Sequence, residues 1–457
     1  MYNYFTKVFL FIALAFVLLS ATIDLNNLFN YANQEIPKYI NKDNTANNPI
    51  NDRVATLGRV LFYDKNLSKD QTIACASCHV QAHAFGDSNV QSLGVNGVTP
   101  RHSMRLINAR FSNENSFFWD ERAETLEDQT TQPIRDPIEM GFSGTNGDPS
   151  FEELINYLET KEYYNTLFQF AFGDFEITEA RMQIALAQFI RSIQSFDSRY
   201  DEGLKQVNFP NEPFPNYTEQ ENRGKDLYLN IGCADCHMLS EFALHFNSLN
   251  NGVITVAGMP GEIDITNIRA PSLRDLVKPD GSLNGPFMHD GSFATLLDVV
   301  NHYNAIPNHP ENTNLDTRLK DPNGNPQQLN LTETEKQNLI AFLKTLGGYD
   351  VYTNEKWSNP FDPDGSIKII DEVLSITEAN KLPFVSVYPN PVIHSATIET
   401  GLTNFTISVY SNTGELLLNE EASTKMTLDF TGYASGLYFI KIVSEGRMVI
   451  TERLLKK

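Results

Sequence analysis

All four cysteines of this chain belong to two copies of one five-residue motif. In each copy two residues separate the cysteines and a histidine follows the second one, as in Cys75-Ala76-Ser77-Cys78-His79 and Cys233-Ala234-Asp235-Cys236-His237. This spacing lets both thiols bond to the two vinyl groups of one haem, while the histidine ligates its iron. The motifs therefore predict two covalently attached c-type haems, held by Cys75, Cys78, Cys233 and Cys236, with His79 and His237 as iron ligands.

Paired cysteines also occur in zinc sites, in thioredoxin-like redox motifs and in the disulfides of exported proteins. A zinc site built from both pairs would leave the repeated histidine without a role. The pairs are also much further apart than zinc ligands usually are. Zinc and disulfide bonds are thus the minor alternatives to haem.

Residues 1–21 have the pattern of a cleaved signal peptide. Lys7 precedes an apolar run over 8–19, and the small residues Ser20 and Ala21 end it. The run is shorter than the ~20 apolar residues of a spanning helix, so a membrane anchor is less favoured. We expect export, with haem attachment in the periplasm and then a place at the cell surface or release.

The net charge of −22 at pH 7 disfavours binding to nucleic acid or to anionic membranes. A chain of 457 residues is also too long for one ordinary core. We therefore expect several folding units, and partners that are neutral, basic or small.

Apolar residues around both motifs recur at helical spacing, for example over 151–172 and 179–196. A proline-rich break at 211–215 precedes a new helix over 219–228, and a capped amphipathic helix begins at 332. The pattern predicts a mainly α protein with two cytochrome c-like haem modules. We expect a leader segment over 22–48, the first module over 49–205 and the second module over 206–349.

The last part of the chain has a different texture, with short runs of alternating apolar and polar residues between turn signals. These runs cover 396–399, 406–410, 416–418, 437–443 and 448–454. They predict a small all-β sandwich domain over 383–457, joined to the helical part by a linker over 350–382.

Three features of this β segment resemble the C-terminal sorting domain of the type IX secretion system. They are Tyr388-Pro389-Asn390-Pro391, Gly436-Leu437-Tyr438 and the final Lys456-Lys457. The resemblance implies that the segment is handled by that secretion machinery. A carbohydrate-binding or adhesive β module is the alternative.

A second resemblance covers roughly residues 50–348. Its motifs are Phe118-Trp119-Asp120-Glu121-Arg122-Ala123, Gln129, Pro133, Glu139-Met140, Ala270-Pro271-Ser272-Leu273-Arg274 and Gly285-Pro286-Phe287-Met288-His289-Asp290-Gly291. They resemble the bacterial di-haem cytochrome c peroxidase and MauG superfamily. The resemblance implies an oxidoreductase that reduces hydrogen peroxide to water through a high-valent haem, with electrons from a small redox protein or an organic donor.

The resemblance also assigns catalytic roles to three residues between the motifs. Trp119 would relay electrons between the haems, while Glu139, with Gln129 beside it, would move a proton during peroxide cleavage on the open face of the first haem. Taken without the resemblance, Trp119 is equally well explained as a core aromatic residue and Glu139 as a surface carboxylate.

Two family features are altered near the first motif. Many members cap the first haem with a histidine, but Val95 stands at that place, and His83 and His102 are badly placed to substitute. We therefore expect this haem to be open to peroxide. His102 also replaces an asparagine that helps the family to hold calcium, and since imidazole is a weaker calcium ligand, a bound calcium ion is in doubt.

The counterpart of the family's axial methionine at the second haem is Tyr303. A thioether ligand raises the iron potential, whereas a phenolate favours ferric and higher oxidation states. Tyrosine at this place resembles MauG, so the alternative function is a MauG-like oxidase of a protein or organic substrate. The other interpretation is that Met288 or Met259 is the ligand and Tyr303 a packed ring.

A non-catalytic electron-transfer cytochrome is the second alternative function. It predicts that both irons have six ligands and do not react with peroxide. Val95, at the place of the capping histidine, argues against it.

Overall fold

The structure, a computed structural model, describes residues 22–112, 117–243, 248–371, 385–400, 404–423, 425–444 and 447–457. The predicted signal peptide lies outside these residues. The chain divides into two units, residues 1–369 and 370–457. Within the described part, no helix has the length and apolar character needed to cross a membrane.

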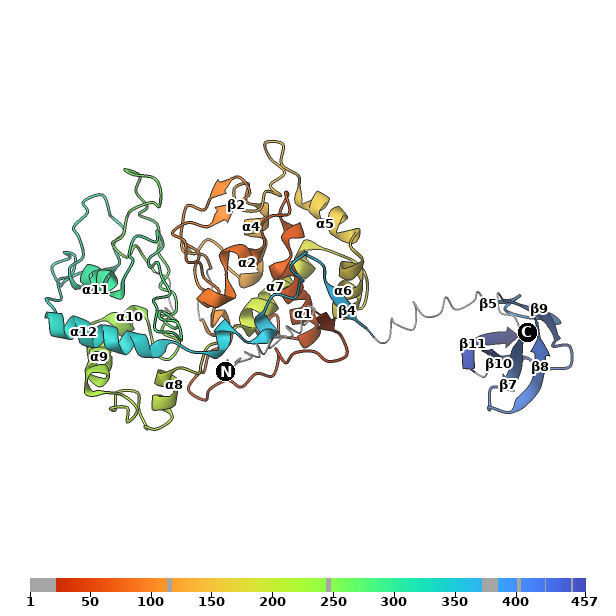
Figure 1. Cartoon of the computed structure of the whole chain (residues 1–457). Coiled ribbons are helices and arrows are strands. Elements are labelled where there is room, and N and C mark those ends of the chain that lie inside the picture. Colours follow the sequence, from red (N-terminus) through yellow and green to blue (C-terminus); the bar gives the residue numbers. More distant parts are fainter. Residues whose placement is uncertain are drawn as a thin grey trace, which may run out of the picture. The chain divides into compact units, whose positions relative to one another are not determined.

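The larger unit contains two helical modules, drawn in red to yellow and in green to cyan in Figure 1. In the first module, helix α1 (Asp52–Tyr63) packs across helix α7 (Glu179–Ser192). Gly58 lies at the crossing, where a Cβ atom would be only 2.0 Å from the carbonyl oxygen of Ala185. The other helices of this module are α2 (Cys75–Cys78), α3 (Leu126–Thr130), α4 (Gln132–Arg135), α5 (Phe151–Glu159) and α6 (Glu162–Phe172).

The second module repeats this crossing with α9 (Glu219–Asn230) and α12 (Glu333–Leu343). A Cβ atom on Gly224 would lie 1.9 Å from the carbonyl oxygen of Asn338. The predicted cap of the last helix is confirmed, since Thr332 and Glu335 form a capping box. The remaining helices of this module are α8 (Arg199–Leu204), α10 (Cys233–Cys236) and α11 (Leu296–Asn304).

A second shared feature is a tight loop that precedes α3 in one module and α11 in the other. Phe117 bridges to Ala123 in the first loop, and Phe287 bridges to Phe293 in the second. Each helix then starts at a threonine that caps it. The two modules therefore share both the helix crossing and the loop that leads back toward the cysteine motif.

The segments on either side of the modules pack against the first one. Tyr31, from the predicted leader, and Trp357, from the predicted linker, are both buried in its core. The Tyr31 hydroxyl donates to the carbonyl of Lys356 (2.7 Å), and Trp357 Nε1 donates to the Ser192 hydroxyl (3.2 Å). Strands β1 (Thr22–Asp24) and β4 (Lys368–Ile370) form a two-stranded sheet. The described part of the predicted linker up to 369 is thus an integral part of the larger unit.

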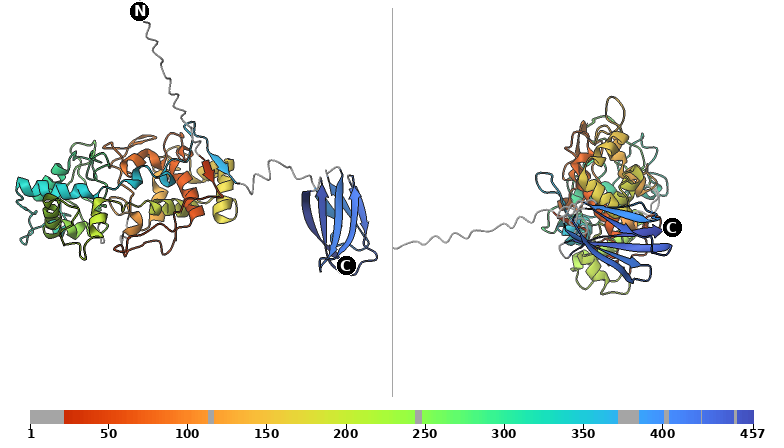
Figure 2. Two further views of the ribbon diagram at one scale, coloured as in Figure 1. Left: turned by 60° about the horizontal axis from the view of Figure 1, so that its bottom comes forward. Right: turned by 90° about the vertical axis from the view of Figure 1, so that its right-hand side faces the viewer.

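The smaller unit consists of two antiparallel sheets, and Figure 2 shows its strands, in blue, running alongside one another. One sheet has the order β5-β6-β9 and the other β11-β10-β7-β8. The strands are β5 (Val385–Tyr388), β6 (Ser395–Thr400), β7 (Phe405–Ser411), β8 (Leu416–Ala422), β9 (Lys425–Asp429), β10 (Gly436–Ser444) and β11 (Arg447–Lys456). The five predicted strands are confirmed, whereas β5 and β9 were not predicted.

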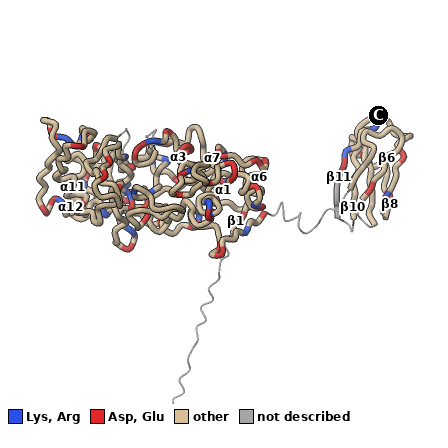
Figure 3. Tube along the Cα trace, turned by 90° about the horizontal axis from the view of Figure 1, so that it is seen from above, with Lys and Arg blue, Asp and Glu red and all other residues tan. Residues whose placement is uncertain are grey.

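Charged residues are distributed over both units without a basic cluster among the residues drawn in colour (Figure 3). This distribution agrees with the strongly acidic composition of the chain.

Candidate functional site

The histidines of both motifs are oriented by backbone carbonyls. His79 Nδ1 lies 3.1 Å from the carbonyl oxygen of Phe85, and His237 Nδ1 lies 3.0 Å from that of Pro271. Because a carbonyl can only accept a hydrogen bond, Nδ1 carries the proton in each ring and Nε2 is left free. Burial lowers the pKa of His79 and lowers that of His237 to about 4. Both rings are therefore neutral, as an iron ligand must be.

Each motif faces its own cavity, and the two cavities enclose about 1530 and 1490 Å³ of space, part of it open to solvent. Their walls are mainly apolar. An apolar cleft with two thiols and a neutral imidazole at one side fits a covalently attached haem. The donor set of each cavity thus agrees with the predicted cofactor.

The three predicted catalytic residues line the cavity of the first motif together. Gln129 comes from α3, Trp119 from the preceding loop and Glu139 from the loop after α4. Burial and the nearby Asp136 raise the pKa of Glu139 to about 7, while Arg122 acts in the opposite direction. A carboxyl group with this pKa exchanges protons near neutral pH.

A short hairpin formed by β2 (Leu93–Gly94) and β3 (Gly97–Val98) holds the backbone that carries Glu139. The amide of Val95 donates to the carbonyl of Glu139 (3.0 Å), and the amide of Asn96 donates to that of Ile138 (3.1 Å). A Cβ atom on Gly94 would lie 2.1 Å from the Ile138 carbonyl oxygen. The hairpin therefore packs directly against the loop of the acid–base candidate.

The nearby histidines occupy different places. Neither Val95 nor His83 is among the described residues that line the first cavity, whereas His102 lines both cavities. His102 Nδ1 lies 2.9 Å from the carbonyl oxygen of Asn89, and burial lowers the pKa of His102 to about 4. Its ring is thus neutral, with Nδ1 directed to the backbone.

Trp119 lies in the wall that the two cavities share. Its indole Nε1 donates to the carbonyl of His102 (2.7 Å), and its ring centre is 6.3 Å from that of His289. Met104, Arg105 and Arg269 also line both cavities, and the sequence analysis assigned a role to none of them. An alignment of the two modules with each other would have drawn attention to Met104 and Arg105.

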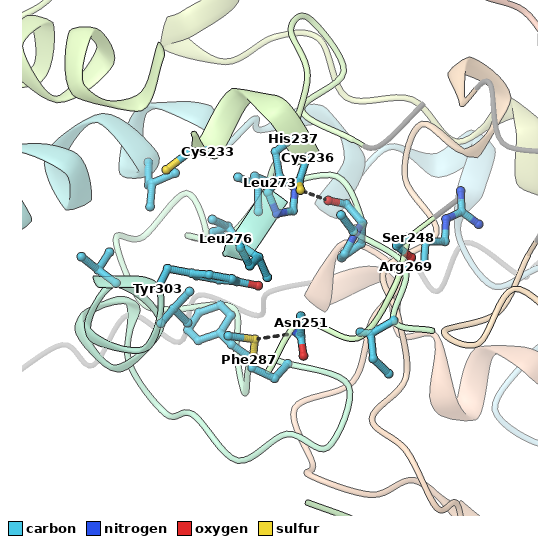
Figure 4. A pocket seen from close by; sticks show the side chains of 18 of the residues that line it. Cys233, Cys236, His237, Ser248, Asn251, Arg269, Leu273, Leu276, Phe287 and Tyr303 are labelled. Carbon is cyan, nitrogen blue, oxygen red and sulfur yellow. Dashed lines mark hydrogen bonds between the residues drawn. The ribbon is translucent and has the colours of Figure 1, made fainter. Parts of the chain in front are cut away.

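Tyr303 lines the second cavity, and Figure 4 shows its hydroxyl directed into the space that His237 faces. Burial raises its pKa. Met288 lines the same cavity, with its sulfur 3.9 Å from Asn251 Nδ2. Met259 is 45% exposed and is not among the residues that line this cavity, whereas Met288 is.

Comparisons with known proteins agree with this geometry. The family model for di-haem cytochrome c peroxidase matches residues 52–208. The methylamine utilization protein MauG of Methylophilus methylotrophus is 30% identical over 318 residues, which are 66% of this chain and 84% of that protein. The chain belongs to the di-haem cytochrome c peroxidase family. It is accordingly an oxidoreductase of the peroxidase type, and the family implies two c-type haems, peroxide and a redox donor.

Other members of this peroxidase family support the assignment. The cytochrome c551 peroxidase of Nitrosomonas europaea is 28% identical, over 66% of this chain and 81% of its own length. A crystal structure of a MauG-like protein associated with microbial copper homeostasis aligns with a TM-score of 0.57 and 32% identity. The alignment covers 72% of this chain and 99% of that protein.

The β unit of this peroxidase has its own match. The family model for a secretion system C-terminal sorting domain covers residues 386–457. The type IX resemblance is therefore confirmed. It implies handling by secretion machinery, and export to the surface or the medium.

Proposed function

We propose that this chain reduces hydrogen peroxide to water in the first cavity, with electrons that a small redox donor delivers through the second module. The observation that carries this proposal is the meeting of Glu139, Gln129 and the first cysteine motif in one cavity. Each module would hold one haem through its own cysteines. His79 would ligate the first iron, and His237 with Tyr303 the second.

The overall reaction consumes one peroxide, two electrons and two protons and yields two waters. When bound, the haem supplies the iron that receives peroxide and exchanges the electrons. Glu139 would take the proton from one oxygen of peroxide and return it to the other oxygen, which leaves as water. The side-chain amide of Gln129 orients peroxide beside this carboxylate.

Trp119 connects the two half-sites in this proposal. It lines both cavities, and its N–H is held by the His102 carbonyl, so its ring has one fixed position between them. A fixed indole at this place gives electrons from the second module a short route to the first.

The replacement Glu139→Gln tests the proposal. It removes the proton carrier but keeps the size of the side chain, so we expect peroxide turnover to fall about 10²–10⁴-fold. In the unaltered protein the rate of the peroxide reaction should rise about tenfold for each unit of increasing pH up to about pH 7 and then level off, because only the carboxylate form accepts a proton. Stopped-flow absorption against pH measures both effects.

The matched control is Glu124→Gln, since Glu124 is exposed and outside the cavity wall. This control should keep full turnover and the same pH profile. Undiminished turnover of Glu139→Gln, with both haems attached, would remove Glu139 from the mechanism.

A MauG-like oxidase is the second candidate function, favoured by the Tyr303 hydroxyl inside the second cavity. Absorption and EPR spectra of the ferric protein, before and after one equivalent of peroxide, separate the candidates. A long-lived oxidised state that decays only with an organic or protein substrate would favour the oxidase. Rapid return to the ferric state with a redox donor would favour the peroxidase, and two unreactive low-spin haems would leave an electron-transfer cytochrome.

A further inference from the structure

The two modules differ at one residue beside the ligand histidines. The amide of Leu106 donates to the carbonyl of Phe85 (3.3 Å), as that of Leu273 donates to the carbonyl of Phe242 (3.1 Å), so Met104 and Pro271, two residues before these leucines, are equivalent. The next residue is Ser272 in the second module, and its hydroxyl donates to the carbonyl of Glu241 (2.8 Å). In the first module the next residue is Arg105. One module thus has a cation where the other has a small neutral side chain.

The surrounding backbone makes room for the arginine. Gly86 bridges to Val80 in the first module, as Ala243 bridges to Met238 in the second. A Cβ atom on Gly86 would lie 2.8 Å from Cγ of Arg105. The glycine therefore lets the arginine stem pass, and the alanine of the other module faces no such stem.

The side chain of Arg105 is half-buried, and its guanidinium lacks a full set of partners. One nitrogen donates to the carbonyl of Asn284 (3.1 Å), while Nε is buried and has no hydrogen-bond partner among the described residues. No described carboxylate forms an ion pair with it. Burial lowers its pKa, whereas Asp275 and Tyr352 act in the opposite direction. A buried cation is costly unless an anion compensates it.

Arg105 lines both cavities, so an occupant of either one can supply the missing anion. A haem carries two carboxylates on one edge, and a planar guanidinium binds a carboxylate with two parallel hydrogen bonds. We infer that Arg105 binds a haem carboxylate in the wall shared by the two cavities and raises the reduction potential of that haem. A nearby cation favours the reduced iron because reduction adds a negative charge. This inference rests on the haem occupancy of the proposed function.

The variant Arg105→Met tests the inference, because it keeps most of the apolar stem and removes the charge. The readouts are the number of covalent haems per chain and the potential of each haem in a spectroelectrochemical titration. We expect two haems, with a lower potential for one or both. Arg105→Lys should retain most of the potential, because it keeps the charge. The control Arg53→Met removes an exposed arginine of the same module, and should change neither potential.

Unchanged potentials in Arg105→Met, with both haems attached, would overturn the inference. An equal fall in Arg105→Lys would also overturn it, because packing and not charge would then set the potential. If Arg105→Met does not fold with two haems, Arg105→Gln provides the same measurement with hydrogen-bond donors but no charge. If the unaltered chain bound no haem, the proposed function would fail instead, so the two failures are distinguishable.

Discussion

The two helical modules share their helix crossing and the contacts of their motif histidines, but different side chains line their cavities. Both cross a pair of helices at a glycine and fix the motif histidine by a backbone carbonyl. The first cavity adds the polar groups of Gln129 and Glu139 to its wall, whereas the second has Tyr303 in a mainly apolar wall. The shared elements therefore position the motif histidines, whereas α3, α11 and the loop after α4 supply the side chains that differ between the cavities.

The difference arises just after the loop that the modules share. Trp119 and His289 occupy equivalent places in that loop, and the fourteenth residue after each is Pro133 and Tyr303, respectively. Proline interrupts a helix by removing an amide donor, and the first module accordingly has two short helices and then the loop with Glu139. In the second module α11 continues without a break and carries Tyr303 to the cavity. Proline in one module and tyrosine at the equivalent place in the other thus lead to different side chains at the two cavities.

The hairpin beside Glu139 belongs to the first module. Of the variants considered below, Gly94→Ala should reduce the rate of the peroxide reaction most. The added Cβ atom would lie 2.1 Å from the Ile138 carbonyl oxygen and would displace the Glu139 loop. A shift of about 1 Å can cost on the order of 10²-fold in rate. Stopped-flow measurement of the peroxide reaction should show a loss of this size. Leu93→Ala, at a side chain that is 66% exposed, is the control and should keep the rate.

If Gly94→Ala kept the full rate while both haems were present, the hairpin would have no part in positioning Glu139. If it slowed the peroxide reaction and also lowered haem content, the effect would be one of folding. The pH profile separates these outcomes further. A displaced carboxyl group changes its burial and therefore its pKa.

Substitutions at the two helix crossings test whether both modules depend equally on close helix packing. Gly58→Ala and Gly224→Ala each place a Cβ atom within 2.0 Å of a carbonyl oxygen on the partner helix. We expect each to lower the free energy of unfolding by about 1–3 kcal/mol, as overpacking does. Urea denaturation followed by haem absorbance measures this loss. A large loss at one glycine and none at the other would show that the modules do not depend equally on their crossings.

Local patterns predicted the repeated elements of this chain well. Helical spacing predicted α7, α9 and α12, and alternation predicted five of the seven strands in the smaller unit. Strand β9 was missed although Met426 and Leu428 alternate with polar residues along it.

Contacts between distant segments were not predictable in the same way. Trp357 is separated from Ser192 by 165 residues, and no local pattern relates the two. Within the site, the joint placement of Trp119, Gln129 and Glu139 was predicted from the family resemblance. Arg105 was missed because its role depends on its position in the wall between two cavities, which no local pattern shows.

Trp119→Phe tests the connection between the two cavities. Phenylalanine keeps an aromatic ring but is much harder to oxidise and loses the N–H bond to His102. We expect steady-state turnover with a redox donor to fall roughly tenfold, or ~1.4 kcal/mol in activation free energy, while the first reaction with peroxide keeps its rate. Trp357→Phe is the matched control, because this other tryptophan of the chain is buried in the first core. Equal turnover in both variants would assign Trp119 to packing alone.

Tyr303→Met should have the smallest effect on turnover and a specific effect on the second haem. A thioether in place of a phenol oxygen favours the reduced iron, so the potential of this haem should rise while that of the first stays constant. Spectroelectrochemical titration measures both potentials in one sample. Tyr200→Phe is the control, because Tyr200 is buried in the same module but does not line the cavity. Met288 would be the ligand if Tyr303→Met left the potential of the second haem unchanged and Met288→Leu altered it. The contrast between the two cavities would then rest on Glu139 and Gln129 alone.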